Sequence, residues 1–312
     1  MKFDKNRFLS FSLIQEFQFD VVNQLISMGL RLALHFNFEG VFMLRAIAMS
    51  TVVAAFSIGL SAFASFAGSP IYESGKAGQK EAQSYTKVKN VSSRYLSYRD
   101  LGPWLSKVQG KAALDYGSGL GFSTEFLVDR GFEVKGADIN PNMIIQAKNS
   151  YPGVDFTLIK DDKLPFANLS FDLVFSSLVL FELSSLQQIE NYLKEARRVL
   201  REDGYFIGIT GSSSMHDPNY KSELRKTDYP QNKGAKSGSL VKVTLNEINL
   251  TFEDYLWFEK DYRKIFQKAG LPICEVHYPL GQKDEPYPWK DELNRSPFIL
   301  ILARKSCTKM SP

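Results

Sequence analysis

The chain has 312 residues and a formal net charge of +4, from 38 basic and 34 acidic side chains; this near balance gives no argument for a nucleic-acid partner. Aromatic residues make up 13% of it, which excludes extensive disorder. Its two cysteines, Cys274 and Cys307, occur without a C-x-x-C pair or a metal-ligand spacing, so neither a disulfide framework nor a metal site is expected.

The first 83 residues differ in composition from the rest and are expected to form an N-terminal extension. They contain the run Ala46–Ala67, which has 22 residues without a charge and follows Arg45. This hydrophobic segment is long enough to cross a bilayer as a helix. It predicts membrane contact, with a Gly-, Ser- and Lys-rich linker over residues 68–83 before the next domain. We expect that domain in the cytosol, although the positive-inside rule applied to Arg45 would place it outside, and the sequence does not resolve this conflict.

The same run allows a second interpretation, a signal peptide that begins at Met43. Arg45 would then be its basic start and Ala62–Ala64 its small-residue cleavage site, with residues 1–42 upstream of the protein. A buried helix is a third interpretation, but little else in the chain is apolar enough to surround it. The residues do not decide between an anchor and a signal peptide.

Residues 84–312 are expected to form a second domain. Its first segment, Ser84–Leu105, is rich in aromatic residues and compatible with helix. The side chains of Tyr85, Tyr95 and Tyr98 either pack there or face a ligand site.

A strand, a glycine turn and the start of a helix follow one another in the stretch ALDYGSGLGFS. Small and β-forming residues lead into Asp115, and glycine then takes every second position, at Gly117, Gly119 and Gly121. Glycine tolerates a positive φ and lets the backbone approach a ligand closely. A dinucleotide fingerprint G-x-G-x-x-G would need its third glycine where this chain has Phe122. The spacing therefore disfavours a dinucleotide site.

Two helices have recognisable start signals. The first is expected over Ser123–Arg130, with Ser123 or Thr124 as its N-cap. The second follows Asn140, a good N-cap, and Pro141, which suits the first helical position.

The strand Phe132–Ile139 ends in Asp138, 17 residues beyond Gly121, where a carboxylate can accept hydrogen bonds from ribose hydroxyls. The motif D-x-G-x-G-x-G, followed by an acid at the tip of the second strand, resembles the class I S-adenosylmethionine (SAM) methyltransferases. The resemblance covers about residues 84–305. It implies a Rossmann-like α/β fold, with a seven-stranded sheet whose last strand is antiparallel and helices on both faces, preceded here by the N-terminal hydrophobic segment.

The resemblance also implies SAM as the cofactor, S-adenosylhomocysteine (SAH) as the product, and no metal. By position, Asp115 and Gly117 would face the aminoacyl end of SAM, and Asp138 would hold its ribose. Gly119 and Gly121 would allow the backbone to approach the cofactor closely.

The third predicted strand, Asp155–Lys160, runs into DDKLPFANLSFD, which resembles the LPF…SFD segment of small-molecule methyltransferases. In that family an acid a few residues before LPF binds the adenine amino group. Asp161 is favoured for this role and Asp162 is the alternative, since the position four before Leu164 is Lys160.

The fourth predicted strand, Phe171–Ser176, leads into the cleft-facing loop Ser177–Leu183. Many members of the family carry a histidine where this chain has Phe181, followed here by Glu182, so the usual candidate base is missing. The [DN]-P-P-[YF] and Pro-Cys motifs of nucleic-acid methyltransferases are also absent from the sequence. A nucleic-acid acceptor is therefore not expected.

The remaining elements follow the usual start and stop signals. Ser184 and Gln187 predict a capping box at the start of a helix that Gly204 ends, and the strand Gly204–Thr210 follows. The last predicted elements are the helix Glu259–Ala269 with Gly270 as its stop, and the strands Ile273–Tyr278 and Phe298–Ala303.

Residues 211–258 are more than a minimal fold requires, and an insert here is expected to cover the substrate. A general base helps methyl transfer only when the acceptor atom carries a proton. The candidates for that role are His216 in the insert, Glu182 after the fourth strand, and His277 near the C-terminus.

The sequence thus predicts a SAM-dependent methyltransferase with a small-molecule acceptor. Two alternatives stay open, a membrane-tethered protein that binds SAM without transferring its methyl group, and an NAD-dependent oxidoreductase. Neither the acceptor atom nor the oligomeric state follows from the residues.

Overall fold

The computed structural model describes residues 71–72, 85–160 and 163–307. The hydrophobic segment 46–67, with both of its interpretations, lies outside these ranges, as do Asp161 and Asp162. Within the described ranges, no helix combines the length and the apolar character needed to cross a membrane.

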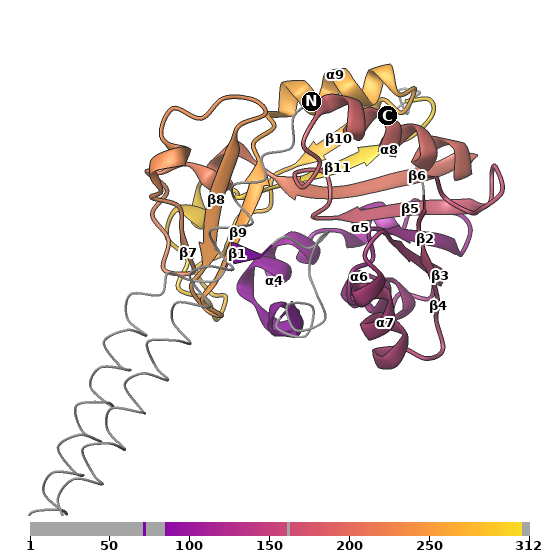
Figure 1. Ribbon diagram of the computed structural model, residues 1–312, viewed down its shortest axis with the longest axis horizontal. Helices are drawn as coiled ribbons and strands as arrows, with labels where there is room; N and C mark the ends of the chain where they lie inside the picture. The colour runs from indigo at the N-terminus through magenta and orange to yellow at the C-terminus, as the bar shows by residue number, and fades with distance from the viewer. Residues whose placement is uncertain (1–70, 73–84, 161–162, 308–312) are drawn as a thin grey trace, which may run out of the picture. The chain divides into compact units, whose positions relative to one another are not determined.

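The main sheet has seven strands in the order β10-β11-β6-β5-β2-β3-β4 (Figure 1). β11 pairs antiparallel with both of its neighbours, and all other pairs in this sheet are parallel. The predicted fold class is thereby confirmed. The strands are β2 (Ala112–Tyr116), β3 (Glu133–Asp138), β4 (Asp155–Leu158), β5 (Phe171–Ser177), β6 (Leu200–Gly211), β10 (Ile273–His277) and β11 (Phe298–Ala303).

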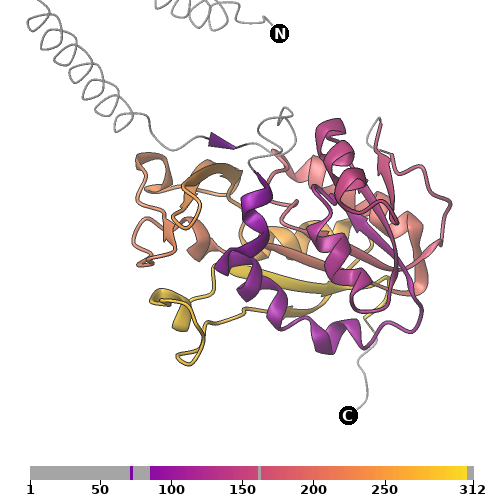
Figure 2. The same ribbon diagram turned by 90° about the horizontal axis from the view of Figure 1, so that it is seen from below.

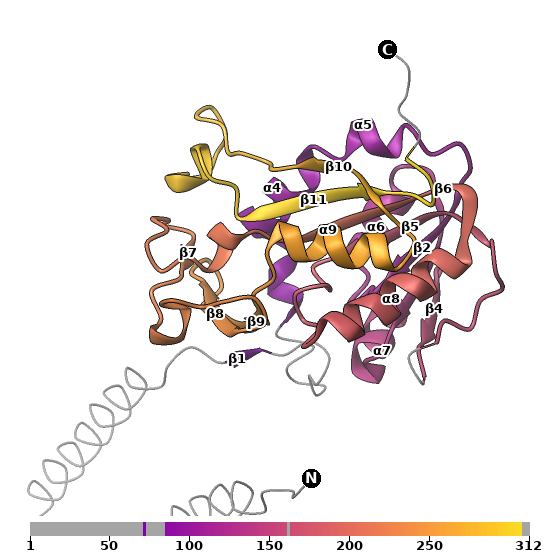
Figure 3. The same cartoon turned by 90° about the horizontal axis from the view of Figure 1, so that it is seen from above.

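Helices cover both faces of this sheet (Figures 1 and 3). Successive side chains of a strand point to opposite faces, and in β2 Ala113 packs with the core under one helical layer while Leu114 packs with the core under the other. One layer consists of α8 (Leu186–Val199) and α9 (Glu259–Lys268). The other consists of α4 (Ser92–Arg99), α5 (Gly102–Leu105), α6 (Phe122–Val128) and α7 (Pro141–Ser150).

Three strands of the predicted insert and β1, from the predicted linker, form a second, four-stranded sheet in the order β1-β9-β8-β7. Two hydrogen bonds join it to the loop after β5: the Tyr255 N–H donates to the Phe181 carbonyl at 2.7 Å, and the Trp257 indole N–H to the Leu183 carbonyl at 3.1 Å. Helix α4 lies between this sheet and α6 (Figures 1 and 2). The strands are β1 (Ile71–Tyr72), β7 (Arg225–Lys226), β8 (Leu240–Leu245) and β9 (Leu250–Tyr255), and a 3-10 turn, η3 (Ser213–His216), precedes β7.

The two predicted helix starts have different outcomes. The Asn140 side chain accepts hydrogen bonds from the first-turn amides of α7, as predicted. The predicted caps of α6 are wrong, because its N-cap is Gly121 and no side chain caps it. Ser123 and Thr124 instead donate their hydroxyl hydrogens to the carboxylate of Asp115 in charge-assisted hydrogen bonds, and do not accept from the helix amides.

Helix α8 corrects the next two predictions. It begins after Ser185, whose side chain caps it, rather than after Ser184, and it ends at Val199 instead of at Gly204. Gly204 lies within β6, where a Cβ would come within 2.9 Å of the Asp172 carbonyl oxygen. The glycine therefore permits close packing of neighbouring strands rather than stopping the helix.

A disulfide joins Cys274 to Cys307, so the expectation of no disulfide is wrong. Cys274 lies in β10, and Cys307 follows the end of β11. The antiparallel pairing of these strands sets Ile273 opposite Ala303, which brings both cysteines to the same end of the pair. Cysteine spacing in the sequence does not reveal this, because the bridge depends on a strand pairing.

We expect replacement of both cysteines by serine to lower the free energy of unfolding by about 2 to 4 kcal/mol, because a bridge restricts the unfolded chain. Urea unfolding of the full chain, followed by circular dichroism, measures the loss. Treatment of the unsubstituted chain with a phosphine reductant should reproduce it and leave the variant unchanged. Equal stability of the oxidised and reduced chains would contradict the prediction.

Candidate functional site

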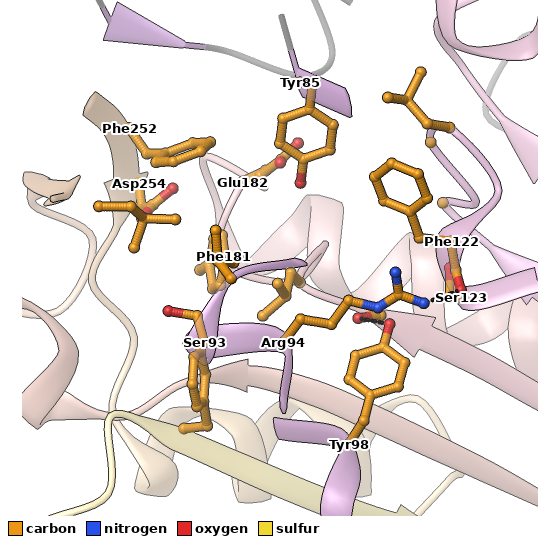
Figure 4. Close-up of a pocket in the computed structure, with 18 of the residues that line it drawn as sticks. Tyr85, Ser93, Arg94, Tyr98, Phe122, Ser123, Phe181, Glu182, Phe252 and Asp254 are labelled. Carbon is orange, nitrogen blue, oxygen red and sulfur yellow. Dashed lines mark hydrogen bonds between the residues drawn. The ribbon is translucent and has the colours of Figure 1, made fainter. Parts of the chain in front are cut away.

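A pocket lies at the carboxyl ends of β2 and β5, where the glycine turn, α4 and the insert meet (Figure 4). It has two halves. Phe122, Ser123, Arg94 and Tyr98 lie toward the glycine turn, whereas Tyr85, Glu182, Phe252 and Asp254 lie toward the insert. The carboxyl ends of parallel strands are the usual place for ligands in such sheets.

Asp115 is fully buried at the end of β2. Its Oδ2 accepts hydrogen bonds from the hydroxyls of Ser123, at 2.7 Å, and Thr124, at 2.6 Å. Burial raises the pKa of Asp115 to about 6, although the two hydroxyls act in the opposite direction. Within the described part of the chain, Asp115 Oδ1 and the buried Oγ of Ser118 have no hydrogen-bond partner. Unpartnered buried polar atoms are costly, so both indicate a ligand or water beside the glycine turn. Ser118 lines the pocket there, whereas Asp115 does not.

The turn after β2 needs glycine at two positions for different reasons. At Gly117, with φ at +81°, a Cβ would meet Val179 Cγ2 at 2.3 Å. At Gly119, with φ at +50°, a Cβ would meet no protein atom within 4 Å. The backbone at Gly119 is therefore open to a ligand, and only its left-handed conformation disfavours a side chain.

Asp138 holds this turn from the end of β3. Its Oδ2 accepts a hydrogen bond from the Gly119 N–H and its Oδ1 one from the Asn140 N–H, both at 2.8 Å. Burial raises the pKa of Asp138, while these amide bonds act in the opposite direction. Each carboxylate oxygen can accept further hydrogen bonds, so the residue can hold the turn and also take a pair of ligand hydroxyls.

Arg94 of α4 is a pocket residue that sequence reasoning missed. Its guanidinium donates to the Phe122 carbonyl at 2.6 Å and lies over the rings of Phe122 and Tyr98. It makes no ion pair with any described residue. It therefore supplies a positive charge to the half of the pocket near the glycine turn. The sequence offered no signal for it beyond a basic residue among the tyrosines before the first strand.

The three candidate bases occupy different places. Glu182 lines the pocket and is exposed to solvent. His216 is buried, and its Nε2 lies 2.9 Å from Oδ2 of Asp254, which does line the pocket. His277 is exposed on β10, hydrogen-bonds Asp100, and does not line the pocket.

Asp254 is the second residue missed. A signal for it was present in the sequence, because residues two apart in a strand share a face, and Phe252 and Asp254 of β9 both line the pocket. The run TFEDYLW was not interpreted as a strand in the sequence analysis.

Comparison with known proteins finds methyltransferases among the sequence relatives and among the solved structures. The sequence profile described as "Methyltransferase domain" matches residues 114–208. The bifunctional biotin-biosynthesis protein of Cellvibrio japonicus is 39% identical over 33% of this chain and 20% of its own length. A demethylmenaquinone methyltransferase of Renibacterium salmoninarum is 33% identical over 32% of this chain and 41% of its own length. The chain thus matches less than half the length of these relatives.

Solved structures share the fold. A putative SAM-dependent methyltransferase from Listeria monocytogenes superimposes with a TM-score of 0.51 at 21% identity, over 67% of this chain and 96% of that chain. At this identity the likeness concerns the fold alone.

The buried Asp115 should leave a pH signature in stability. Its folded pKa of about 6 lies above the ordinary value, so the unfolded chain loses this proton first as the pH rises. Protonated Asp115 therefore contributes its full stabilisation below about pH 4. This contribution, about 2 to 3 kcal/mol, is lost as the pH rises through 6.

The free energy of unfolding of the unsubstituted chain, measured by urea unfolding at each pH, should therefore fall by about 2 to 3 kcal/mol more between pH 4 and pH 7 than that of Asp115→Asn. Asp155→Asn, which removes an exposed carboxylate paired with Lys135, is the matched control. A stability difference that stays constant with pH would contradict the prediction.

Proposed function

We propose that this chain carries a class I SAM-dependent methyltransferase domain and transfers the methyl group of SAM to a small-molecule acceptor. The observation that carries the proposal is the pair of unpartnered buried atoms, Asp115 Oδ1 and Ser118 Oγ, beside a glycine turn that opens onto a pocket. A polar ligand at the turn would satisfy both atoms. Both are oxygens that can accept a hydrogen bond, which fits a cofactor with an ammonium group.

We propose the following cofactor contacts. Asp115 and Arg94 hold the ammonium and carboxylate of the aminoacyl end, since they place opposite charges near the glycine turn. The backbone at Gly117 and Gly119, which line the pocket, allows close approach, and Asp138 accepts the ribose hydroxyls. Gly121 does not line the pocket; it is needed because a Cβ there would meet the rings of Tyr151 and Phe156. Asp161 or Asp162, outside the described residues, holds the adenine.

SAM supplies a methyl group on a positively charged sulfur, so the work left to the chain is mostly alignment. The insert and the loop after β5 form the acceptor half of the pocket, and apolar side chains such as Phe181, Met215 and Phe252 keep water out of it. Where the acceptor atom carries a proton, Glu182 and Asp254, backed by His216, are the groups placed to receive it. His277 is not proposed, because it bonds Asp100 away from the pocket.

A small-molecule acceptor agrees with the names of the relatives, one of which acts on demethylmenaquinone. We propose that the insert, residues 211–258, covers this acceptor, because its strands β8 and β9 contribute pocket side chains. No described feature favours the NAD-dependent alternative, since Phe122 begins α6 where that fingerprint needs glycine.

Calorimetric titration of the full chain with SAM and SAH tests the cofactor assignment. We expect micromolar binding that Asp138→Asn weakens by roughly 10- to 100-fold, because an amide replaces a charged acceptor of hydrogen bonds. Asp155→Asn, on the neighbouring strand, should bind as the unsubstituted chain does. Absence of heat with both ligands, in a chain that circular dichroism shows to be folded, would refute the proposal.

A further inference from the structure

We propose that the methyl acceptor is an apolar, ring-sized molecule that donates a hydrogen bond from a hydroxyl or an amine to Asp254, and that the pocket rejects acceptors bearing a carboxylate. This inference rests on the proposed methyltransferase function and specifies its substrate class. It is carried by the position of Asp254, by its hydrogen bond with His216, and by the charges around it.

Asp254 brings a charged group into an apolar wall. Its side chain is only 3% exposed, yet it lines the pocket beside Phe252 of the same strand. Phe181, Met215 and Val243 line the same half. A buried carboxylate in such surroundings is unfavourable unless hydrogen bonds or a ligand compensate it, so a polar partner is expected in the pocket.

His216 satisfies only part of this carboxylate. An ionised carboxylate can only accept hydrogen bonds, so the bond between His216 Nε2 and Asp254 Oδ2 requires the histidine to donate. Among the described residues, Asp254 makes no other side-chain hydrogen bond. His216 is thus a positioning residue that fixes one oxygen and leaves the other, Oδ1, to accept from a ligand.

The charges around this half of the pocket select against anions. Glu182 adds a second carboxylate near Asp254 (Figure 4). Tyr85, Glu182 and Asp254 lie around one space (Figure 4). Burial raises the pKa of Tyr85, and the nearby negative charges of Glu182 and Asp254 raise it further. Arg94 is the one cationic side chain among the described lining residues, and it lies in the other half, against the Phe122 carbonyl. A carboxylate in the acceptor half would meet two like charges and, among the described lining residues, no cationic partner.

A hydroxyl and an amine offer the same chemistry to Asp254, a hydrogen-bond donor on an apolar body. A phenol-like hydroxyl donates as a neutral group, whereas an alkylamine donates as a cation that both carboxylates attract. Probes of one ring size separate these two sources from each other and from ligands that lack a donor.

The test is a calorimetric titration of the full chain, saturated with SAH, with four naphthalene probes. 2-Naphthol and 2-(aminomethyl)naphthalene carry a donor, 2-methoxynaphthalene carries none, and 2-naphthoate is an anion. We expect one or both donor probes to bind at least about tenfold more tightly than the ether and the anion, the factor that one hydrogen bond to a charged group provides. The donor probe that binds more tightly shows whether the acceptor group is a hydroxyl or an amine.

Asp254→Asn should abolish this preference without changing the affinity for SAH. Glu253→Gln is the matched control, because Glu253 precedes Asp254 in β9 and pairs with Lys242 instead; its preference should stay. His216→Leu should reduce the preference and His216→Gln, which keeps a side-chain N–H, should retain more of it.

The outcomes separate the two proposals. If SAH binds but the donor probes bind no more tightly than the ether, or if Asp254→Asn keeps the preference, the inference is overturned and the methyltransferase proposal stands. If none of the four probes binds while SAH does, a ring-sized apolar acceptor is likewise overturned. If SAH itself does not bind, the proposed function fails first.

Discussion

The buried carboxylate of Asp115 is the constraint on which the site depends. It ends β2 in an interior where its ionised form is unfavourable, and the hydroxyls of Ser123 and Thr124 stabilise one of its oxygens from the first turn of α6. This contact joins strand to helix across the glycine turn and fixes where the turn lies. Asp138 holds the same turn from the neighbouring strand through the Gly119 amide. The carboxylates of Asp115 and Asp138 therefore hold the backbone of the glycine turn in place.

The strand order explains why a pocket forms at this turn. From β2 the chain builds outward to β3 and β4 and then returns to place β5 and β6 on the opposite side. The connections diverge at this reversal and leave a crevice at the carboxyl ends of β2 and β5. The insert that follows β6 closes the crevice, and the bond from Tyr255 to the Phe181 carbonyl holds it against the loop after β5.

The seven-stranded sheet was expected from the family resemblance, whereas periodicity and glycine spacing in the sequence were enough to predict individual strands and the turn, because these depend on local pattern. The Asn140 cap was predicted for the same reason, since cap and amides are neighbours in the chain. The absence of a side-chain cap on α6 could not be predicted, because the Ser123 and Thr124 hydroxyls donate hydrogen bonds to the buried Asp115, which lies outside the local sequence pattern of a helix start. The Cys274–Cys307 bridge and the His216–Asp254 pair escaped prediction because each joins residues that only the tertiary fold brings together. Strand pairing does so for the cysteines, and the contact of η3 with β9 does so for His216 and Asp254.

In the proposed function, the two halves of the pocket have different tasks, cofactor binding near the glycine turn and acceptor binding near the insert. The half near the glycine turn is built within residues 114–208, where the family profile matches, and by α4. The acceptor half is built largely from residues beyond that match, including Asp254 of β9, Val243 of β8 and Met215 of η3.

The position where many family members carry a histidine holds Phe181, so the polar group on the acceptor side comes instead from the insert. In the proposed function the shared core binds the cofactor, and the insert determines which acceptor fits beside it. Relatives that match only the core therefore indicate the reaction type better than they indicate the acceptor.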